Sequence, residues 1–191
     1  MIKTLLIAGA FCLAGGAVGA TTLDFDTAVG DLAGVDLGEV TITAGGSPVS
    51  AASTPNGSTG LLAYDFNCGC FPNAFTATFE TAMTDVSVDL GDFNQDADDL
   101  YLYAYDAANV LVDSFLISID AAFIGLETLT VSATSISYVV FGGVGLNGEN
   151  NVYADNLTFS GNVAAVPVPA AGLLLIGGLG LLGAVRRRPR A

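Results

Sequence analysis

Histidine and basic residues are what this sequence lacks most. It contains no histidine, no tryptophan, and five lysine and arginine residues against 19 aspartates and glutamates. Without histidine, neither a Ser-His-Asp nor a Cys-His arrangement can be built, and the usual histidine-containing zinc sites are excluded. Paired carboxylates of the kind that glycosidases use remain available, but 19 acidic residues produce such pairs by chance. We therefore expect a protein that is not an enzyme.

The few basic residues lie at the two ends of the chain. One is Lys3, and the other four are Arg186, Arg187, Arg188 and Arg190. Residues 21–165 therefore have no lysine for Schiff-base chemistry and no arginine for a bidentate phosphate clamp. All 19 carboxylates lie between Asp24 and Asp155. Such a body repels phosphates, so we expect cations, and not nucleic acid, as partners.

The first 20 residues have the pattern of a secretory signal peptide. Lys3 supplies a minimal positive region, and an apolar stretch runs from Leu5 to Val18. The small residues at 18–20 suit cleavage after Ala20. We therefore expect a secreted protein whose mature chain begins near Thr21.

The last 26 residues, VPVPAAGLLLIGGLGLLGAVRRRPRA, combine three features in order. The first is a proline motif of Val166, Pro167, Val168, Pro169 and Ala170. The second is an uncharged apolar run, which reaches the roughly 20 residues that span a bilayer when it is counted from Val166. The third is the arginine cluster, a feature that stays on the cytoplasmic side of a membrane. One interpretation is a plain C-terminal anchor with a single transmembrane helix.

This order of proline motif, apolar helix and arginine cluster resembles the PEP-CTERM class of bacterial sorting signals. VPVPA is similar to the VPxPA variant of that class, with Val168 where the commoner pattern carries a glutamate. The resemblance implies recognition by an exosortase-type membrane peptidase and cleavage near the proline motif. It also implies transient anchoring in the inner membrane, followed by delivery to the cell envelope or extracellular matrix of a Gram-negative bacterium.

Two of the three cysteines, Cys68 and Cys70, stand close together in NCGCFP. A secreted protein with two such cysteines favours a disulfide. Residues i and i+2 of a straight strand lie about 6 to 7 Å apart at Cα with parallel Cβ vectors, so a bridge needs a bend, which Gly69 permits. A local bridge, two free thiols and bonds to another molecule all remain open.

Residues 21–165 are enough for one domain with a real core. Short segments alternate apolar and polar residues as half-buried strands do, for example GEVTITAG, AFTATFE, DVSVDL, TLTVSA, ISYVVFG and NVYADNLTFS. LYLYAY, DAAN and VLVDSFLISI together predict a hairpin, whereas AASTPNGSTG at 51–60 predicts a surface loop. About eight or more short strands favour an all-β fold, a β-sandwich of jelly-roll type.

The body also resembles the jelly-roll modules that occur in PEP-CTERM proteins and are related to carbohydrate-binding domains. LDFD, DLGDFNQDADDLYLYAYDAANVL and VYADNLTF carry this resemblance. It implies the same sandwich fold. It also implies a structural Ca²⁺ between the first and last strands, with Asp24 or Asp26 beside Asp155.

A separate acidic segment, GDFNQDADD, contains the oxygen ligands that Ca²⁺ prefers. The spacing begins like an EF-hand loop, but Ala97 stands at its glycine position and Tyr103 at its glutamate position. We therefore predict a calcium site of another kind, with candidate ligands Asp92, Asn94, Asp96, Asp98 and Asp99. At both candidate calcium sites, the competing interpretation is that the aspartates are turn residues on a solvated surface.

Three tyrosines alternate with three apolar residues in the middle of the chain. They are Tyr101, Tyr103 and Tyr105, alternating with Leu100, Leu102 and Ala104. The two sets point to opposite faces of a strand. If the leucines face the core, the tyrosines form an exposed row suited to stacking on sugar rings. If both faces of the sheet are covered, the tyrosines are packing residues.

These features predict three parts: a signal peptide at 1–20, a β-sandwich domain at 21–165 and a sorting signal at 166–191. We expect a non-enzymatic secreted surface or extracellular-matrix protein associated with exopolysaccharide or biofilm. A carbohydrate-binding jelly-roll module is the competing hypothesis, and a glycosidase-like enzyme is the third. Glycan binding without turnover would favour the second hypothesis, and turnover the third.

Overall fold

The computed structural model describes residues 19–27, 35–45, 48–63, 74–93, 96–145 and 152–161. All of them belong to one compact unit, Val18–Asn162. Residues 1–18 of the predicted signal peptide and the predicted sorting signal lie outside the described residues, as do Asn94, Cys68 and Cys70. Among the residues that are described, no helix is long and apolar enough to cross a membrane.

The described residues form ten strands, and all of their pairings are antiparallel. The all-β prediction is therefore confirmed. The strands are β1 (Thr21–Leu23), β2 (Val35–Asp36), β3 (Val40–Thr43), β4 (Val49–Ser53), β5 (Thr59–Ala63), β6 (Phe75–Phe93), β7 (Asp98–Tyr105), β8 (Leu111–Ile119), β9 (Ile124–Val144) and β10 (Tyr153–Ser160). The expectation of short strands was wrong for β6 and β9, which have 19 and 21 residues.

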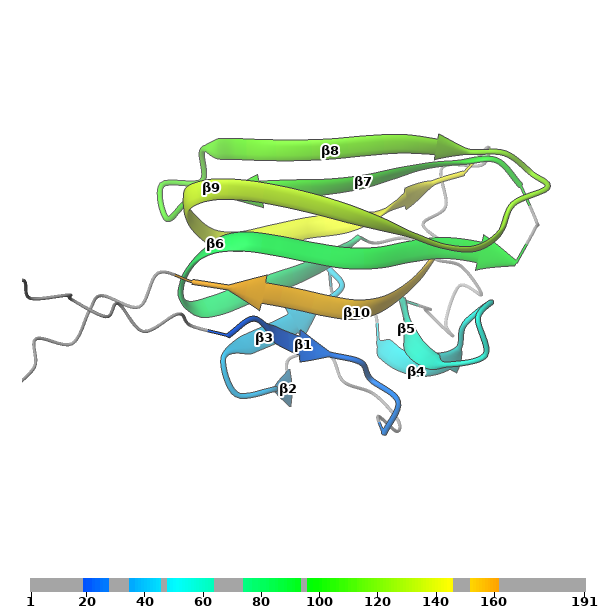
Figure 1. Cartoon of the computed structure of the whole chain (residues 1–191), viewed down its shortest axis with the longest axis horizontal. Coiled ribbons are helices and arrows are strands. Elements are labelled where there is room, and N and C mark those ends of the chain that lie inside the picture. The colour runs from blue at the N-terminus through cyan, green and yellow to red at the C-terminus, as the bar shows by residue number, and fades with distance from the viewer. Residues whose placement is uncertain are drawn as a thin grey trace, which may run out of the picture. The chain divides into compact units, whose positions relative to one another are not determined.

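β6 and β9 are long because each continues from one layer of the fold into the other. Residues 75–78 of β6 pair with 138–141 of β9, and residues 85–93 pair with 124–132. The register shifts on both sides of Met83, and Figure 1 shows β6 and β9 turning over at the same end of the molecule. The single hydrogen-bonded sheet is thereby folded into two layers.

The two layers are named here after the strands β7 and β10. In the β7 layer, β3, the start of β6, the end of β9, β7 and β8 follow one another, and β2 pairs with β3. In the β10 layer, the start of β9, the end of β6, β10, β5 and β4 follow one another, and β1 pairs with β10. Both layers thus contain segments from distant parts of the chain.

Apolar side chains from both layers form one core. Fully buried members include Ile42, Phe75, Leu102 and Phe141 from the β7 layer and Leu61, Leu90, Leu129 and Leu157 from the β10 layer. The ring of Phe79 in the β7 layer lies 5.2 Å, centroid to centroid, from the ring of Phe159 in the β10 layer. The burial of this apolar surface between the layers is the main force that holds them together.

β7 and β8 form the predicted hairpin. Its turn begins at Asp106, whose Oδ1 accepts hydrogen bonds from the backbone N–H of Ala108 at 2.8 Å and of Val110 at 2.9 Å. Asn109 has φ 60, a left-handed conformation that asparagine tolerates well. The Asp and Asn of the DAAN segment therefore perform the turn functions that the sequence indicated.

Residues 51–60, expected as a loop, form a second hairpin instead. Residues 51–53 belong to β4 and residues 59–60 to β5, with a turn between them. In the turn, the N–H of Thr54 donates to the carbonyl of Ser58, and the N–H of Gly57 donates to the carbonyl of Thr54, both at 3.0 Å. Small polar residues have a weak intrinsic preference for strands. They form strands here because β4 and β5 pair with each other, and this pairing outweighs that preference.

Candidate cation site and tyrosine platform

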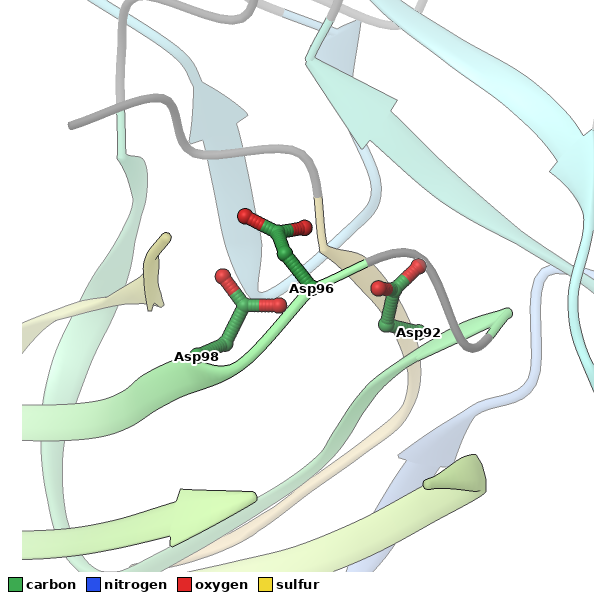
Figure 2. Close-up of side chains that lie close together, drawn as sticks. All are labelled: Asp92, Asp96 and Asp98. Carbon is green, nitrogen blue, oxygen red and sulfur yellow. The ribbon is translucent and has the colours of Figure 1, made fainter. Parts of the chain in front are cut away.

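Three aspartates meet where the chain passes from β6 to β7. Asp92 is near the end of β6, Asp98 is the first residue of β7, and Asp96 lies between the two strands. One carboxylate oxygen of each lies within 4.8 Å of those of the other two. Figure 2 shows the three carboxylates gathered around this connection. In the described part of the chain, no other group of three acidic side chains meets this criterion.

Asp98 is the most unusual member of this acidic cluster. Its exposed fraction is 1%, and neither of its carboxylate oxygens has a hydrogen-bond partner among the described residues. Burial is the main cause that raises the pKa of the Asp98 carboxyl to about 6, and the neighbouring carboxylates of Asp96, Asp92 and Asp99 raise it further. A buried charge without a partner is costly, and a bound cation removes that cost.

Gly145 lies directly against the acidic cluster. A Cβ atom at this position would come within 2.6 Å of Oδ2 of Asp96 and 2.9 Å of Oδ1 of Asp98. The absence of a side chain at Gly145 therefore leaves the room that the two carboxylates occupy. A cavity of about 290 Å³ adjoins the cluster and is lined by Ala97, Asp98, Asp99, Ser118, Ile119, Val144 and Gly145.

The acidic cluster can bind a metal ion. Carboxylate oxygens are the ligands that Ca²⁺ and Mg²⁺ prefer, and water can complete the coordination of either ion. Of the predicted ligands in this segment, the structure brings together Asp92, Asp96 and Asp98. Asp99 is exposed and accepts a hydrogen bond from Oγ of Ser118 at 2.5 Å, and Asn94 lies outside the described residues.

The other predicted calcium ligands have protein partners. Asp155 is 2% exposed, and its carboxylate accepts hydrogen bonds from Oγ of Ser58 at 2.6 Å and from the N–H of Asn156 at 2.8 Å. Burial raises the pKa of Asp155 despite these bonds, with a smaller contribution from the charge of Asp26. Asp26, which follows β1, also has a protein partner, because its Oδ1 accepts a hydrogen bond from the N–H of Thr59 at 2.9 Å.

Asp24 takes part in a local turn. Its Oδ1 accepts a hydrogen bond from the N–H of Asp26 at 3.2 Å. This is the turn contact that aspartate commonly makes to a backbone group two residues later. Among the described residues, the connection from β6 to β7 therefore fits a cation better than the surroundings of Asp155 do.

The three predicted tyrosines lie on the outer face of the β7 layer. Leu100, Leu102 and Ala104 are fully buried, so the alternation of β7 turns Tyr101, Tyr103 and Tyr105 outward. These rings are half-buried. Tyr101 and Tyr103 stack with their ring centroids 5.0 Å apart.

A fourth tyrosine, Tyr138, extends this row, and the sequence did not reveal it. Tyr138 belongs to β9 and is the register partner of Tyr105. The two rings stack with their centroids 4.9 Å apart and 7° between their planes. The alternation of ISYVVF places Tyr138 on one face of its strand, but the pairing with Tyr105 depends on a register between distant segments. We call these four residues the tyrosine platform.

Hydroxyl groups continue the outer face beyond the tyrosine platform. Thr78 of β6 pairs with Tyr138, and Thr41 of β3 pairs with Thr78. On the other side of the platform, Leu116 of β8 pairs with Tyr101 and is 59% exposed. The face therefore combines aromatic rings, hydroxyls and exposed aliphatic side chains, of which Leu116 is the most exposed. Burial raises the pKa of the Tyr101 hydroxyl, so this ring remains neutral at physiological pH.

No protein-family model matches the chain, and no curated protein matches it. Among solved structures, an arabinose-bound α-L-arabinofuranosidase (MgGH51) is similar with a TM-score of 0.49 and 10% identity, covering 77% of this chain and 27% of that chain. The family 29 carbohydrate-binding module CBM29-2 has a TM-score of 0.42 and 12% identity, covering 78% of this chain and 100% of that chain.

A third similar structure is CsCBM6-3 from Clostridium stercorarium in complex with cellobiose. It has a TM-score of 0.38 and 13% identity, and the match covers 70% of this chain and 95% of that chain. At such identities, and with TM-scores below 0.5, these likenesses assign neither a family nor a function to the chain.

Proposed function

We propose that this protein is a secreted, non-enzymatic carbohydrate-binding protein, and that the tyrosine platform is its binding surface. One observation carries the proposal. The complete burial of Leu100, Leu102 and Ala104 leaves the tyrosine rings of β7 on the outer face, where no described strand covers them. The sequence predicted a row of tyrosines suited to sugar rings if the leucines of this strand face the core, and packing residues if both faces of the sheet are covered.

The chemistry of the platform suits a sugar ring. A tyrosine ring offers a flat apolar face to the C–H groups of a pyranose, and its hydroxyl can exchange hydrogen bonds with the sugar hydroxyls. Two stacked tyrosine pairs and the adjoining threonines extend this surface over three strands, β7, β9 and β6. An extended surface of this composition fits a polysaccharide chain better than a single small molecule.

The two-layered, antiparallel architecture supports a β-sandwich of jelly-roll type for residues 21–165. In such a fold the cation site would be structural, and we propose Ca²⁺ as the ion. The acidic cluster lies at the first residue of β7, so a bound ion would fix the start of the strand that carries three of the four platform tyrosines.

The absence of histidine, lysine and arginine from residues 21–165 supports a binding function without catalysis.

The terminal patterns support secretion, recognition by an exosortase-type membrane peptidase through the VPVPA motif, and release to the cell envelope or matrix. There the protein would associate with exopolysaccharide.

A glycan-binding assay with a parallel assay for turnover tests this function. The full chain is tested against a panel of neutral and acidic bacterial exopolysaccharides by affinity electrophoresis, and the recovered glycans are analysed for shortened products. We expect retardation by at least one polysaccharide and no shortened products. Release of oligosaccharides would replace the proposal by a glycosidase, and the absence of binding across the panel would remove the carbohydrate-binding function.

A further inference from the structure

β8 presents an unusual apolar surface. Of the large apolar side chains that are exposed in the described residues, most lie on β8 or directly before it: Val110, Leu111, Val112, Phe115, Leu116 and Ile117. Their exposed fractions range from 36% to 59%. Leu116 is exposed on the outer face of β8, and Phe115 and Ile117 are exposed on its other face. Isolated exposed apolar residues are normal in soluble proteins, but several along one strand mark that strand as an interaction surface.

β8 is also an edge strand in the described part of the chain, where it pairs only with β7. Figure 1 shows it at the margin of the molecule, beyond β7. The N–H of Ser114 donates to Oδ1 of Asp113 at 2.8 Å and therefore points away from β7. Alternate residues of a strand direct their N–H groups to the same side, so Leu116 and Ser118 also present theirs to the open edge.

Natural proteins protect an open edge with lysine, proline or an inward-pointing charge. Residues 111–119 contain neither lysine nor proline. The one protecting charge is Asp113, whose Oδ2 accepts a hydrogen bond from the N–H of Ser132 at 2.7 Å. Asp113 thus covers the first part of the edge, and the part from Leu116 onward is left uncovered.

The charge of the body argues for a second copy of this chain as the occupant. Because all charges between residues 21 and 165 are negative, most surfaces of one copy repel the same surfaces of another. β8 differs because its single carboxylate is already hydrogen-bonded and its other side chains are uncharged. A basic partner would be drawn to the carboxylate-rich surfaces, whereas an uncharged apolar strand fits β8.

We propose that two copies of this protein associate through antiparallel pairing of β8 with β8, with Leu116 on the two-fold axis. In this register Phe115 of each copy faces Ile117 of the other, an aromatic and β-branched pair of the kind that stabilises sheets. The two Asp113 carboxylates are six residues apart along the paired strands, about 20 Å at the usual rise per residue. That separation exceeds the Debye length of about 8 Å at physiological ionic strength, so their repulsion is screened.

This pairing has a consequence for ligand binding. A two-fold axis perpendicular to the sheet keeps the outer faces of both β7 layers on the same side of the dimer. Leu116 pairs with Tyr101 within one copy, so the two tyrosine platforms lie on either side of the axis. A long polysaccharide could contact both platforms, which would raise its apparent affinity through multivalency. The self-association itself does not depend on glycan binding.

A cysteine placed on the axis tests the register. Cys12, Cys68 and Cys70 are replaced by serine in the full chain, kept in non-ionic detergent micelles, and Leu116→Cys is added. Residues that form a hydrogen-bonded antiparallel pair have Cα atoms about 5.5 Å apart, within the range that a disulfide requires. We expect most of the L116C chain to become a covalent dimer under mild oxidation. The matched control, Thr43→Cys, is exposed on β3 and should form no covalent dimer.

A second variant keeps all native cysteines. Leu116→Asp places two like charges opposite each other on the axis, and Thr43→Asp adds the same charge elsewhere. In sedimentation velocity, we expect the wild-type chain and T43D to be dimeric and L116D to be monomeric, with unchanged circular dichroism. A monomeric wild-type chain, equal sedimentation of L116D and T43D, or equal crosslinking of L116C and T43C would overturn the proposal.

Discussion

Asp98 and Tyr101 lie on opposite faces of the same strand, three residues apart. Asp98 is 1% exposed on the core side of β7, and Tyr101 is half-buried on the outer side. Asp98, whose carboxylate has no hydrogen-bond partner among the described residues, and Tyr101, the first ring of the tyrosine platform, therefore belong to one strand. An ion that holds Asp98 would therefore also hold the end of the strand on which the platform begins.

The first prediction is that calcium stabilises the fold. An ion that binds only the folded state adds RT ln(1 + [L]/Kd), about 2.7 kcal/mol at a hundredfold excess over Kd. For a domain of this size, that raises the unfolding midpoint by about 5 to 10 °C. Thermal unfolding of the full chain should show this rise with Ca²⁺ and lose it with chelator. An equal rise with sodium chloride at matched ionic strength would mean that only charge screening is involved.

Asp98→Asn should have opposite effects in the presence and absence of calcium. At pH 7 without the ion, the substitution removes a buried charge and should raise the free energy of unfolding by about 1 kcal/mol or more. With calcium, D98N should lose the stabilisation because one ligand has lost its charge. The control is Asp99→Asn, since Asp99 is exposed and faces the other side of β7. If D99N and D98N respond alike, Asp98 is not a ligand.

The raised pKa of Asp98 predicts how stability changes with pH in chelator. Burial raises the pKa of this carboxyl from its ordinary value of 3.8 to about 6 in the folded chain. As the pH rises between these values, the unfolded chain loses its proton while the folded chain retains it, so the stability from this group falls. The difference between the thermal unfolding midpoints of the wild-type chain and D98N, taken as wild type minus D98N, should therefore decrease from pH 4 to pH 7. A constant difference would show that Asp98 titrates normally.

The terminal patterns predict proteolytic processing at both ends. Intact-mass measurement on protein from its native host should give a chain that starts near Thr21 and ends near the 166–170 motif. If the mature protein retains Arg186 to Arg190, the plain membrane anchor replaces the sorting signal. Pro167→Ala with Pro169→Ala should block C-terminal cleavage, and Asn156→Asp, in β10 before the motif, should not.

Most individual strands could be predicted from the sequence because their alternation is local. The continuity of β6 could not, because its buried positions change parity at the bend: Phe79 and Met83 are odd-numbered, and Val86 and Val88 are even-numbered. From the sequence this pattern indicates two short strands. The register shift that joins them depends on pairing with β9, which no local pattern reveals.

Part of the candidate cation site could also be predicted from local sequence, and part of it could not. The density of carboxylates between Asp92 and Asp99 predicted a cation site, and alternation with the buried Leu100 explains why Asp98 faces inward and Asp99 outward. The sequence could not predict that Gly145 leaves room for the carboxylates of Asp96 and Asp98. Gly145 follows β9, far from these aspartates in sequence, and only the folded chain places it beside them.

The last prediction concerns the tyrosine platform and separates stacking from packing. Tyr103→Ala should weaken polysaccharide binding about tenfold, or about 1.4 kcal/mol. The substitution removes one of the rings that would contact the sugar, and it also removes the stacking partner of Tyr101. Its effect on the free energy of unfolding should stay below about 2 kcal/mol, since the ring is only half-buried.

The matched control for this prediction is Tyr103→Phe, which keeps the ring and removes the hydroxyl. If stacking carries the affinity, Y103F should bind nearly as well as the wild-type chain. If hydrogen bonding carries it, Y103F and Y103A should be equally weak. Isothermal titration and thermal unfolding on the same samples distinguish these outcomes. A large loss of stability in Y103A with unchanged binding would show that the ring supports the sheet, and the glycan site would then have to lie elsewhere on the molecule.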